Sequence, residues 1–302
     1  MSAPVLQIDG LHVLLRGERG APERLVLRGV DLSIMPGEVH ALVGESGAGK
    51  SMIARTVLGI LPHRAQVASG HVRLLGHDWL KMPPAARRAM LGRDVSLIPQ
   101  DPMSALSPAH TIERQICEVL RLHLPMSAQA ARERALALLD AVRIREPARV
   151  LHQYPHELSG GMRQRVLIAI AFACGPRLIV ADEPTTALDV TVQREVLRLL
   201  RTMQQRGGGQ SGGTAVLFIT HNLGLVAKLA DRVSVIHGGR IVERGLVAEI
   251  FDAPHAAYTR ALFAATPRHD RPAEALRPID PAVTAALDVE AAAYDNAWAR
   301  AR

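Results

Sequence analysis

The segment that most constrains this chain is Gly44-Glu45-Ser46-Gly47-Ala48-Gly49-Lys50-Ser51. It fits the pattern G-x-x-x-x-G-K-[ST], in which a glycine-rich turn leads from a buried strand into a helix and its backbone N–H groups surround phosphate oxygens. The required context is present, because Val39–Val43 reads as a buried strand and Ser51–Leu61 as the following helix. We therefore predict an α/β fold in which Gly44 to Met52 bind the phosphates of a nucleotide.

The choice of lysine at position 50 supports this prediction. The net charge of +7 comes from 33 Arg and only 3 Lys, so the chain strongly prefers Arg elsewhere. A compact ammonium fits among phosphate oxygens where a planar guanidinium does not. We expect Lys50 to contact the β- and γ-phosphates and the Ser51 hydroxyl to bind Mg²⁺. The Arg-rich surface could attract lipid headgroups, nucleic acid or an acidic partner, but a solvated surface is the simpler interpretation.

Two further strands end in residues suited to phosphate chemistry. The apolar run Leu178–Ala181 ends in Asp182 and Glu183, and two acids at the edge of a core indicate a cation site or a catalytic task. We assign Asp182 to Mg²⁺ and Glu183 to the water that attacks the γ-phosphate. His221 follows the strand Ala215–Ile219, where it could bind the γ-phosphate or position that water.

Gln100 follows a fourth short strand, Val95–Ile98, and its amide could bind Mg²⁺ or sense the γ-phosphate. It stands at the start of a helical block, in which Thr111–His123 and Ser127–Val142 have the clearest helical periodicity. We predict a helical subdomain, at about residues 101–172, inserted in a mostly parallel sheet. Gln100 would then be a hinge between the chemical step at the γ-phosphate and movement of the helical subdomain.

The rest of the chain has local signals only. Leu25–Ile34 predicts antiparallel strands beside the core, and Val233–Glu243 predicts a hairpin with a two-glycine turn. The glycine-rich residues 207–213 read as a flexible connection. Within the tail, 266–302, Asp280 precedes a proline and reads as the N-cap of an Ala-rich helix. The tail could dock on a partner, but a loosely held appendage is the favoured interpretation.

Composition excludes several classes of protein. The longest apolar run, Val166–Cys174, is far shorter than the ~20 residues of a membrane-spanning helix. The first residues, Met1–Asp9, lack the features of a secretory signal, so we expect a cytosolic chain. Two cysteines, Cys117 and Cys174, agree with a reducing compartment and are too few for a zinc knuckle or an iron–sulfur cluster.

The segment Leu158-Ser159-Gly160-Gly161-Met162-Arg163-Gln164 has no general chemical interpretation beyond a serine and two glycines at a helix start. It resembles the signature of the ABC ATPases, and the resemblance covers roughly residues 3–265. In that family the serine and glycines contact the γ-phosphate held by the opposite subunit. The resemblance implies that Ser159, Gly160, Gly161, Gln164 and Asp189 bind nucleotide, and that two ATP molecules lie between two cassettes.

A narrower resemblance is to the ATPases of peptide and nickel importers, at Ile98–Met103, Tyr154–Met162, Ala181–Thr191 and Ile250–His255. It implies a peripheral subunit on the cytoplasmic face of the inner membrane that hydrolyses ATP, with Mg²⁺, to import a peptide-like solute or a metal chelate. The implied partners are a second ATPase subunit, identical or homologous, two membrane permeases and an extracytoplasmic solute-binding protein, with no nucleic acid.

Departures from the family pattern leave some contacts open. No aromatic residue precedes the phosphate loop where the family commonly stacks adenine, and Arg24 or Leu25 stands there instead. Asn222 follows His221 where the family usually has aspartate. Ala256-Ala257 replaces a proline-containing segment, and the cysteine-rich C-terminal region of many dipeptide and oligopeptide members is absent, so the solute stays open.

Two alternatives remain. A DNA-repair or chromosome ATPase shares the signature and would use the Arg surface on nucleic acid. Such proteins place long coiled coils or zinc modules between phosphate loop and signature, and this chain has neither heptads of that length nor a cysteine cluster there. A translation-associated ATPase normally carries two cassettes in one chain, whereas one signature is found here.

Overall fold

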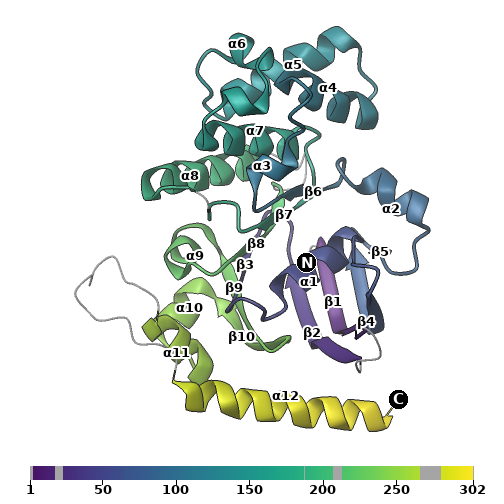
Figure 1. The fold of residues 1–302 in the computed structure, drawn as a ribbon, viewed down its shortest axis with the longest axis vertical. Helices are drawn as coiled ribbons and strands as arrows, with labels where there is room; N and C mark the ends of the chain where they lie inside the picture. Colours follow the sequence, from purple (N-terminus) through teal and green to yellow (C-terminus); the bar gives the residue numbers. More distant parts are fainter. Residues whose placement is uncertain (1–2, 18–22, 187, 207–212, 266–279, 302) are drawn as a thin grey trace. The chain divides into compact units, whose positions relative to one another are not determined.

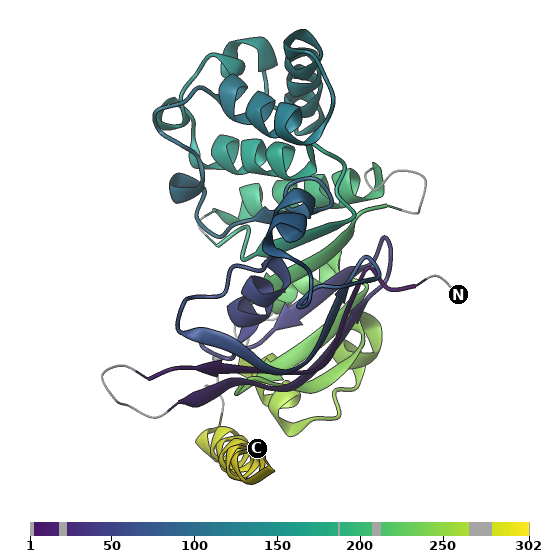
Figure 2. The same ribbon diagram turned by 90° about the vertical axis from the view of Figure 1, so that its right-hand side faces the viewer.

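The computed structural model describes the protein at residues 3–17, 23–186, 188–206, 213–265 and 280–301. The fold comprises two compact units, coloured along the chain in Figure 1 and turned by 90° in Figure 2. The first unit combines Met1–Met82 with Phe218–Arg302, and the second is Pro83–Leu217. Each unit is described below by itself.

An antiparallel sheet with the strand order β2-β1-β4-β5 forms one part of the first unit. Its strands are β1 (Leu6–Leu15), β2 (Arg24–Ile34), β4 (Ala65–Leu74) and β5 (His77–Asp78). The register of the β1–β2 pair places Leu6 opposite Ile34. The antiparallel strands predicted around Leu25–Ile34 are confirmed.

A second group of strands in this unit carries the parallel pairing that positions the site. Strand β3 (Val39–Val43) pairs in parallel with β9 (Arg232–His237), and β9 pairs antiparallel with β10 (Arg240–Leu246). The hairpin turn consists of Gly238 at φ 51° and Gly239 at φ 75°. Both values lie in the left-handed region that two-residue hairpin turns require, so the predicted hairpin is confirmed.

The described residues of the first unit form the helices α1 (Lys50–Leu58), α9 (Leu223–Leu229), α10 (Val247–Asp252), α11 (Ala257–Ala265) and α12 (Pro281–Ala301). The first of them is shorter than predicted, because the sequence pattern extended it to Leu61. Gly59 adopts φ 65° and donates its N–H to Thr56 O at 3.1 Å, while Ile60 N donates to Arg55 O. This left-handed glycine ends the helix.

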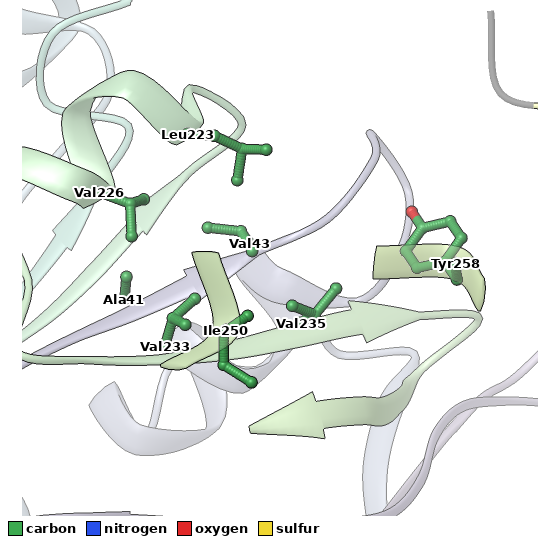
Figure 3. Close-up of a cluster of buried hydrophobic side chains, with 8 residues drawn as sticks. All are labelled: Ala41, Val43, Leu223, Val226, Val233, Val235, Ile250 and Tyr258. Carbon is green, nitrogen blue, oxygen red and sulfur yellow. The ribbon is translucent and has the colours of Figure 1, made fainter. Parts of the chain in front are cut away.

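The core beneath these helices is a compact apolar cluster, drawn in Figure 3. The cluster lies between one face of β3 and β9 and the helices α9, α10 and α11. Its members are Ala41, Val43, Leu223, Val226, Val233, Val235, Ile250 and Tyr258. Ala41 and Val43 are two residues apart on β3, so they face the same side of the strand, as Val233 and Val235 do on β9. The cluster fixes the strands from which the phosphate loop and the hairpin emerge.

The second unit has a parallel strand pair and a block of helices. Strand β6 (Val95–Ile98) pairs with β7 (Leu178–Asp182), and Ile98 lies opposite Ala181. Strand β8 (Ala215–Thr220) begins in this unit and ends in the first one. The helices are α2 (Pro84–Met90), α3 (Pro102–Ala105), α4 (Ile112–His123), α5 (Ala128–Ala141), α6 (Pro147–Leu151), α7 (Gly160–Phe172) and α8 (Val190–Arg206), with a 3₁₀ turn at Pro155–Glu157.

The two clearest helices of the sequence are confirmed, and their starts have a simple cause. Thr111 Oγ1 accepts the backbone N–H of Arg114, and Ser127 Oγ accepts that of Ala130. Both residues are therefore N-caps that precede α4 and α5. The predicted bounds of the inserted subdomain and of the larger domains remain a prediction.

The C-terminal helix begins where the sequence indicates, because Asp280 Oδ1 accepts the N–H of Ala282 at 2.9 Å. The expectation of a loosely held appendage is wrong for this helix, since α12 contacts β2 and α11 within the first unit. Residues 266–279, like 207–212, lie outside the described residues. Within the described ranges, no helix is both long enough and apolar enough to span a membrane.

Candidate functional site

The loop Gly44–Ser51, hereafter the phosphate loop, joins β3 to α1, and two of its glycines are required by their surroundings. A Cβ on Gly44 would lie 2.2 Å from the carbonyl oxygen of Ile236 on β9. Gly49 precedes the helix at φ 107°, and a Cβ there would lie 2.9 Å from Leu27 Cδ2. Any side chain at either position would displace the loop from the strands behind it.

Lys50 is held inside this loop. Its side chain is buried, and the ammonium donates to Gly44 O at 2.7 Å and to Glu45 O at 2.8 Å. The tip of the loop, Glu45 to Gly47, is exposed, as is Ser51 in the first turn of α1. With no acidic residue in that turn, the helix N-terminus presents the positive end of its dipole to an anion.

The β9–β10 hairpin and α11 both contact the phosphate loop, and no local signal in the sequence indicates these contacts. Gly239 N donates to Ala48 O at 2.9 Å. Tyr258 donates its hydroxyl to Glu45 Oε2 at 3.3 Å, and His237 Nδ1 lies 3.9 Å from the same oxygen. Burial, followed by the charge of Glu45, raises the pKa of Tyr258 well above its usual value, so the phenol stays a donor.

His221 also belongs to the first unit and lies exposed just beyond β8. The next residue caps the following helix: Asn222 Oδ1 accepts the N–H of Gly224 at 3.0 Å, while Asn222 N donates to Thr220 Oγ1. Asparagine is as good an N-cap as aspartate. The replacement of the usual aspartate therefore preserves the turn that carries His221.

The second unit brings together two of the predicted catalytic residues. Because Ile98 and Ala181 are opposite each other on parallel strands, Gln100 and Glu183 both stand two residues past that pair. Gln100 Nε2 donates to Glu183 Oε2 at 3.2 Å. Thr186 Oγ1 donates to the same oxygen at 2.9 Å. The sequence placed both residues at strand ends, and the structure shows that they touch.

Glu183 has an unusual backbone. Its φ is 47°, in the left-handed region that a residue with a Cβ adopts at a cost of order 1 kcal/mol or more. Such strain persists only where the surroundings impose it, and it is concentrated at functional sites. Together with the two donors on Oε2, it fixes the direction of a half-buried carboxylate immediately after Asp182. This geometry suits a general base or a group that orients water.

The serine and glycines of the signature segment lie at the start of α7. Ser159 is the N-cap, and its Oγ accepts the N–H of Met162 at 3.3 Å. A Cβ on Gly160 would meet no heavy atom within 4 Å, whereas one on Gly161 would lie 3.1 Å from Val192 Cγ1. The Gly160 side of this turn is therefore open to a ligand, while the Gly161 side packs on α8. A cavity of about 490 Å³ adjoins Ser159.

Two further residues assigned to nucleotide, Asp189 and Gln164, differ in their surroundings. Asp189 Oδ1 accepts the N–H groups of Thr191 and Val192, both at 3.0 Å, and so caps α8. Gln164 is almost completely buried in α7, and its Nε2 has no hydrogen-bond partner within the described part of the chain. Nucleotide contact by either residue stays a prediction.

The residues assigned to a metal offer a hydroxyl (Ser51), an amide (Gln100) and a carboxylate (Asp182). Oxygen donors of this kind suit Mg²⁺, which is usually bound by one or two protein groups together with phosphates and water. In the described ranges no group of three or more His, Cys, Asp or Glu side chains could hold a metal by itself. The donor set thus fits Mg²⁺ only together with a bound nucleotide.

Comparison with known proteins identifies the chain's relatives. The family model described as ABC transporter matches residues 27–186, more than half of the chain. A peptidoglycan transport ATP-binding protein (YejF) of Agrobacterium fabrum is 48% identical over 91% of this chain, which spans 50% of that protein's length. A dipeptide transport ATP-binding protein (DppD) of Bacillus subtilis is 42% identical over 91% of this chain and 81% of its own length.

Solved structures give the same fold. The dimeric ATP-binding cassette MJ0796 in a post-hydrolysis state with ADP and phosphate superposes with a TM-score of 0.69 at 24% identity, covering 80% of this chain and 98% of that one. The cbiO1 protein of Clostridium perfringens, part of an ABC transporter complex, gives 0.68 at 25% identity, covering 83% of this chain and 92% of its own. The predicted α/β cassette fold is confirmed.

Proposed function

This chain belongs to the ABC transporter family, and from that premise we propose that it is the ATP-binding subunit of an importer for a peptide-like solute. Its reaction is the hydrolysis of ATP to ADP and phosphate, coupled to movement of the solute across a membrane. A nickel or other metal chelate is the narrower alternative cargo. The transport names of the relatives do not favour an ATPase that acts on nucleic acid.

The phosphate loop supplies the first part of the mechanism. Residues Gly44 to Met52 bind the phosphates through backbone N–H groups and the N-terminus of α1. Lys50 exchanges its present contacts with two loop carbonyls for the β- and γ-phosphates. Ser51 and Asp182 are the groups that would hold Mg²⁺, which when bound neutralises charge on the phosphates.

Hydrolysis is the task of the Gln100–Glu183 pair in this proposal. Glu183 accepts a proton from, or orients, the water that attacks the γ-phosphate, and the hydrogen bonds from Gln100 and Thr186 aim its carboxylate. His221 hydrogen-bonds the γ-phosphate or the water. Movement of Gln100 with the bound phosphate would pass the state of the nucleotide to the helices that follow it in the chain.

The signature requires a second subunit. Ser159, Gly160 and Gly161 would contact the γ-phosphate of ATP bound to the other ATPase subunit, since the open side of Gly160 and the N-terminus of α7 suit an anion. The solved MJ0796 cassette is dimeric, which supports this arrangement. Two permease subunits and an extracytoplasmic solute-binding protein complete the proposed assembly, with this chain on the cytoplasmic face of the inner membrane.

The observation that carries the peptide assignment is the 42–48% identity with ATP-binding proteins named for peptide, dipeptide or peptidoglycan transport. Reconstitution of this chain with the permeases and binding protein encoded beside it tests the assignment. A binding protein loaded with a dipeptide should stimulate phosphate release, and the same protein offered a nickel chelate should not. Stimulation by the chelate alone selects the alternative cargo, and stimulation by DNA in low salt contradicts the importer.

A further inference from the structure

Helix α12 is attached to the first unit through apolar, aromatic and polar contacts. It contacts β2, and in the view of Figure 1 it lies below β2 and β10. Its first half, with Val283 and Leu287, packs at the edge of the apolar cluster and leaves a cavity of about 570 Å³ against β10 and α11. Apolar packing is therefore incomplete there, and the second half adds polar and aromatic contacts.

The strongest of these contacts is an ion pair between α12 and β2. Arg28 Nε donates to Asp295 Oδ1 at 2.6 Å, and the guanidinium donates a second hydrogen bond to Oδ2 at 2.7 Å. The side chains are only 13% and 33% exposed. A bidentate pair shielded in this way is stronger and more directional than an exposed ion pair. Asp295 thus fixes the plane of the Arg28 guanidinium.

The same guanidinium reaches the hairpin turn. Its third nitrogen donates to Gly238 O at 2.6 Å, and the backbone N–H of Arg28 donates to Gly239 O at 2.9 Å. Gly239 is pressed so closely on β2 that a Cβ would lie 2.0 Å from Val26 O. Arg28 therefore holds both glycines of the turn against β2.

The turn in turn holds the phosphate loop, because the N–H of Gly239 donates to Ala48 O at 2.9 Å. Ala48 lies between the two glycines whose conformation shapes the loop, Gly47 at φ 82° and Gly49 at φ 107°. A continuous series of hydrogen bonds thus runs from Asp295 through Arg28 and the turn to the backbone that is assigned to the phosphates.

A second feature shows that the approach of α12 is built into the sequence of β2. Gly29 adopts φ 62°, and a Cβ there would lie 2.9 Å from the hydroxyl oxygen of Tyr294. That hydroxyl lies 2.7 Å from His12 Nε2, and Trp298 stacks on the same imidazole with centroids 5.7 Å apart. Glycine at position 29 makes room for the helix and lets Asp295 reach its partner.

We propose that Asp295 is a positioning residue for ATP binding, which acts through Arg28 and the Gly238–Gly239 turn on the phosphate loop. The pair preorganises the loop, so ATP binds without first ordering the backbone around Ala48. This inference rests on the assignment of the phosphate loop to ATP. It gives the C-terminal helix a role in the affinity for nucleotide rather than in the chemical step.

The test measures ATP affinity and phosphate release in the full chain. Asp295→Ala should raise the Kd and the KM for ATP about fivefold or more, the lower end of typical coupling between sites, with kcat unchanged. Asp295→Glu, which keeps the carboxylate, should recover part of the loss. Glu290→Ala is the matched control, because Glu290 is 62% exposed and its ion pair with Arg240 on β10 is longer, at 3.6 Å. Its Kd should equal that of the wild type.

Several results would overturn the proposal. These are a wild-type Kd for Asp295→Ala, an equal rise in Kd for Glu290→Ala, and a fall in kcat without a change in KM. Where Asp295→Ala fails to fold, as judged by its thermal transition, Asp295→Asn removes the charge at constant volume and decides the question in the same way. Arg28→Ala with Asp295→Ala should be non-additive, and full additivity contradicts a pairwise mechanism.

The result for Lys50→Ala separates this inference from the function on which it rests. If Lys50→Ala loses ATP and Asp295→Ala does not, the positioning role is wrong and the phosphate loop stands. If Lys50→Ala keeps its affinity, the assignment of the loop itself is wrong.

Discussion

Gln100 Nε2 donates a hydrogen bond to Glu183 Oε2 across a distance of 3.2 Å, from the ends of two neighbouring parallel strands. The contact joins the residue that opens the helical block to the residue proposed to activate water. Glu183 also has a left-handed backbone, and Thr186 donates a second hydrogen bond to the same carboxylate oxygen. The pair is therefore the part of the second unit best suited to hydrolysis.

Removal of the carboxylate charge should separate binding from turnover. Glu183→Gln keeps the volume of the side chain but cannot take a proton, so phosphate release should fall about 100-fold or more while ATP binding is retained. The variant should also accumulate as a closed, ATP-bound dimer, visible by gel filtration with light scattering. Glu118→Gln, at an exposed pair on α4, is the control. Undiminished turnover would remove Glu183 from this role.

The proposed role of Lys50 in ATP binding can be tested by comparison with Lys81, an exposed lysine outside the phosphate loop. Lys50→Ala removes a charged donor to the phosphates, and a loss of ~3 kcal/mol, or about 100-fold in Kd for ATP, is expected. Lys81→Ala changes a side chain that is 77% exposed and should bind ATP normally. Isothermal titration of both variants provides the comparison. Equal affinities would contradict the assignment of the phosphate loop.

The two signature glycines should behave differently. Gly160→Ala adds a methyl group into open space, so the unfolding free energy should hardly change, while ATP hydrolysis falls about tenfold if a phosphate must approach there. Gly161→Ala crowds Val192 and should cost about 1 kcal/mol of stability, measured by urea unfolding. Full hydrolysis by Gly160→Ala would show that nucleotide does not use this side of the turn.

The hydrogen bonds of Glu243 to the loop before α11 predict that the unfolding free energy depends on pH in the acid range. Glu243 accepts the N–H groups of His255 at 2.7 Å and Ala256 at 3.1 Å. Desolvation acts to raise the pKa of Glu243, but the nearby Thr259 side chain, the two backbone N–H donors and the charge of His255 outweigh it, so the pKa is lowered. Its contribution to stability is present above the unfolded pKa and is lost as pH falls through the lower, folded pKa.

Glu243→Gln should remove that contribution. Urea unfolding of wild type and variant should differ at pH 7, and the difference should shrink as the pH falls below about 4.5, the ordinary pKa of the group. Glu133→Gln, on the surface of α5, serves as control and should show a constant difference. If the difference in unfolding free energy between wild type and Glu243→Gln stays the same from pH 7 to pH 3, the ionised Glu243 carboxylate is not its cause.

The sequence was most informative where local chemistry decides structure. Thr111 and Ser127 are helix caps, and two adjacent glycines close a hairpin, because each feature depends on residues a few positions apart. The strand ends were also predictable, and with them the positions of Gln100 and Glu183 along the chain. The early end of α1 was missed, since Gly59 acts as a left-handed cap only once the following residues turn away.

Contacts between distant segments had no local signal. The pairing of Arg28 with Asp295 joins residues 267 positions apart, and neither residue belongs to a motif. The contacts of Tyr258 and His237 with Glu45 also join residues that are far apart in the sequence. In each case the partner is brought in by the packing of the β9–β10 hairpin, α11 or α12 on the strands of the first unit, which depends on the assembled fold. The strained φ of Glu183 likewise follows from its surroundings rather than from its neighbours in sequence.

We propose that ATP is held jointly by the phosphate loop of one subunit and the signature of another. Cryo-EM of the assembled transporter carrying Glu183→Gln in this chain, with ATP and Mg²⁺, would show whether this is so. We expect Lys50 on the phosphates of one ATP and Ser159 within hydrogen-bond distance of the γ-phosphate bound to the second ATPase subunit. A map in which Ser159 lies far from every nucleotide would contradict it.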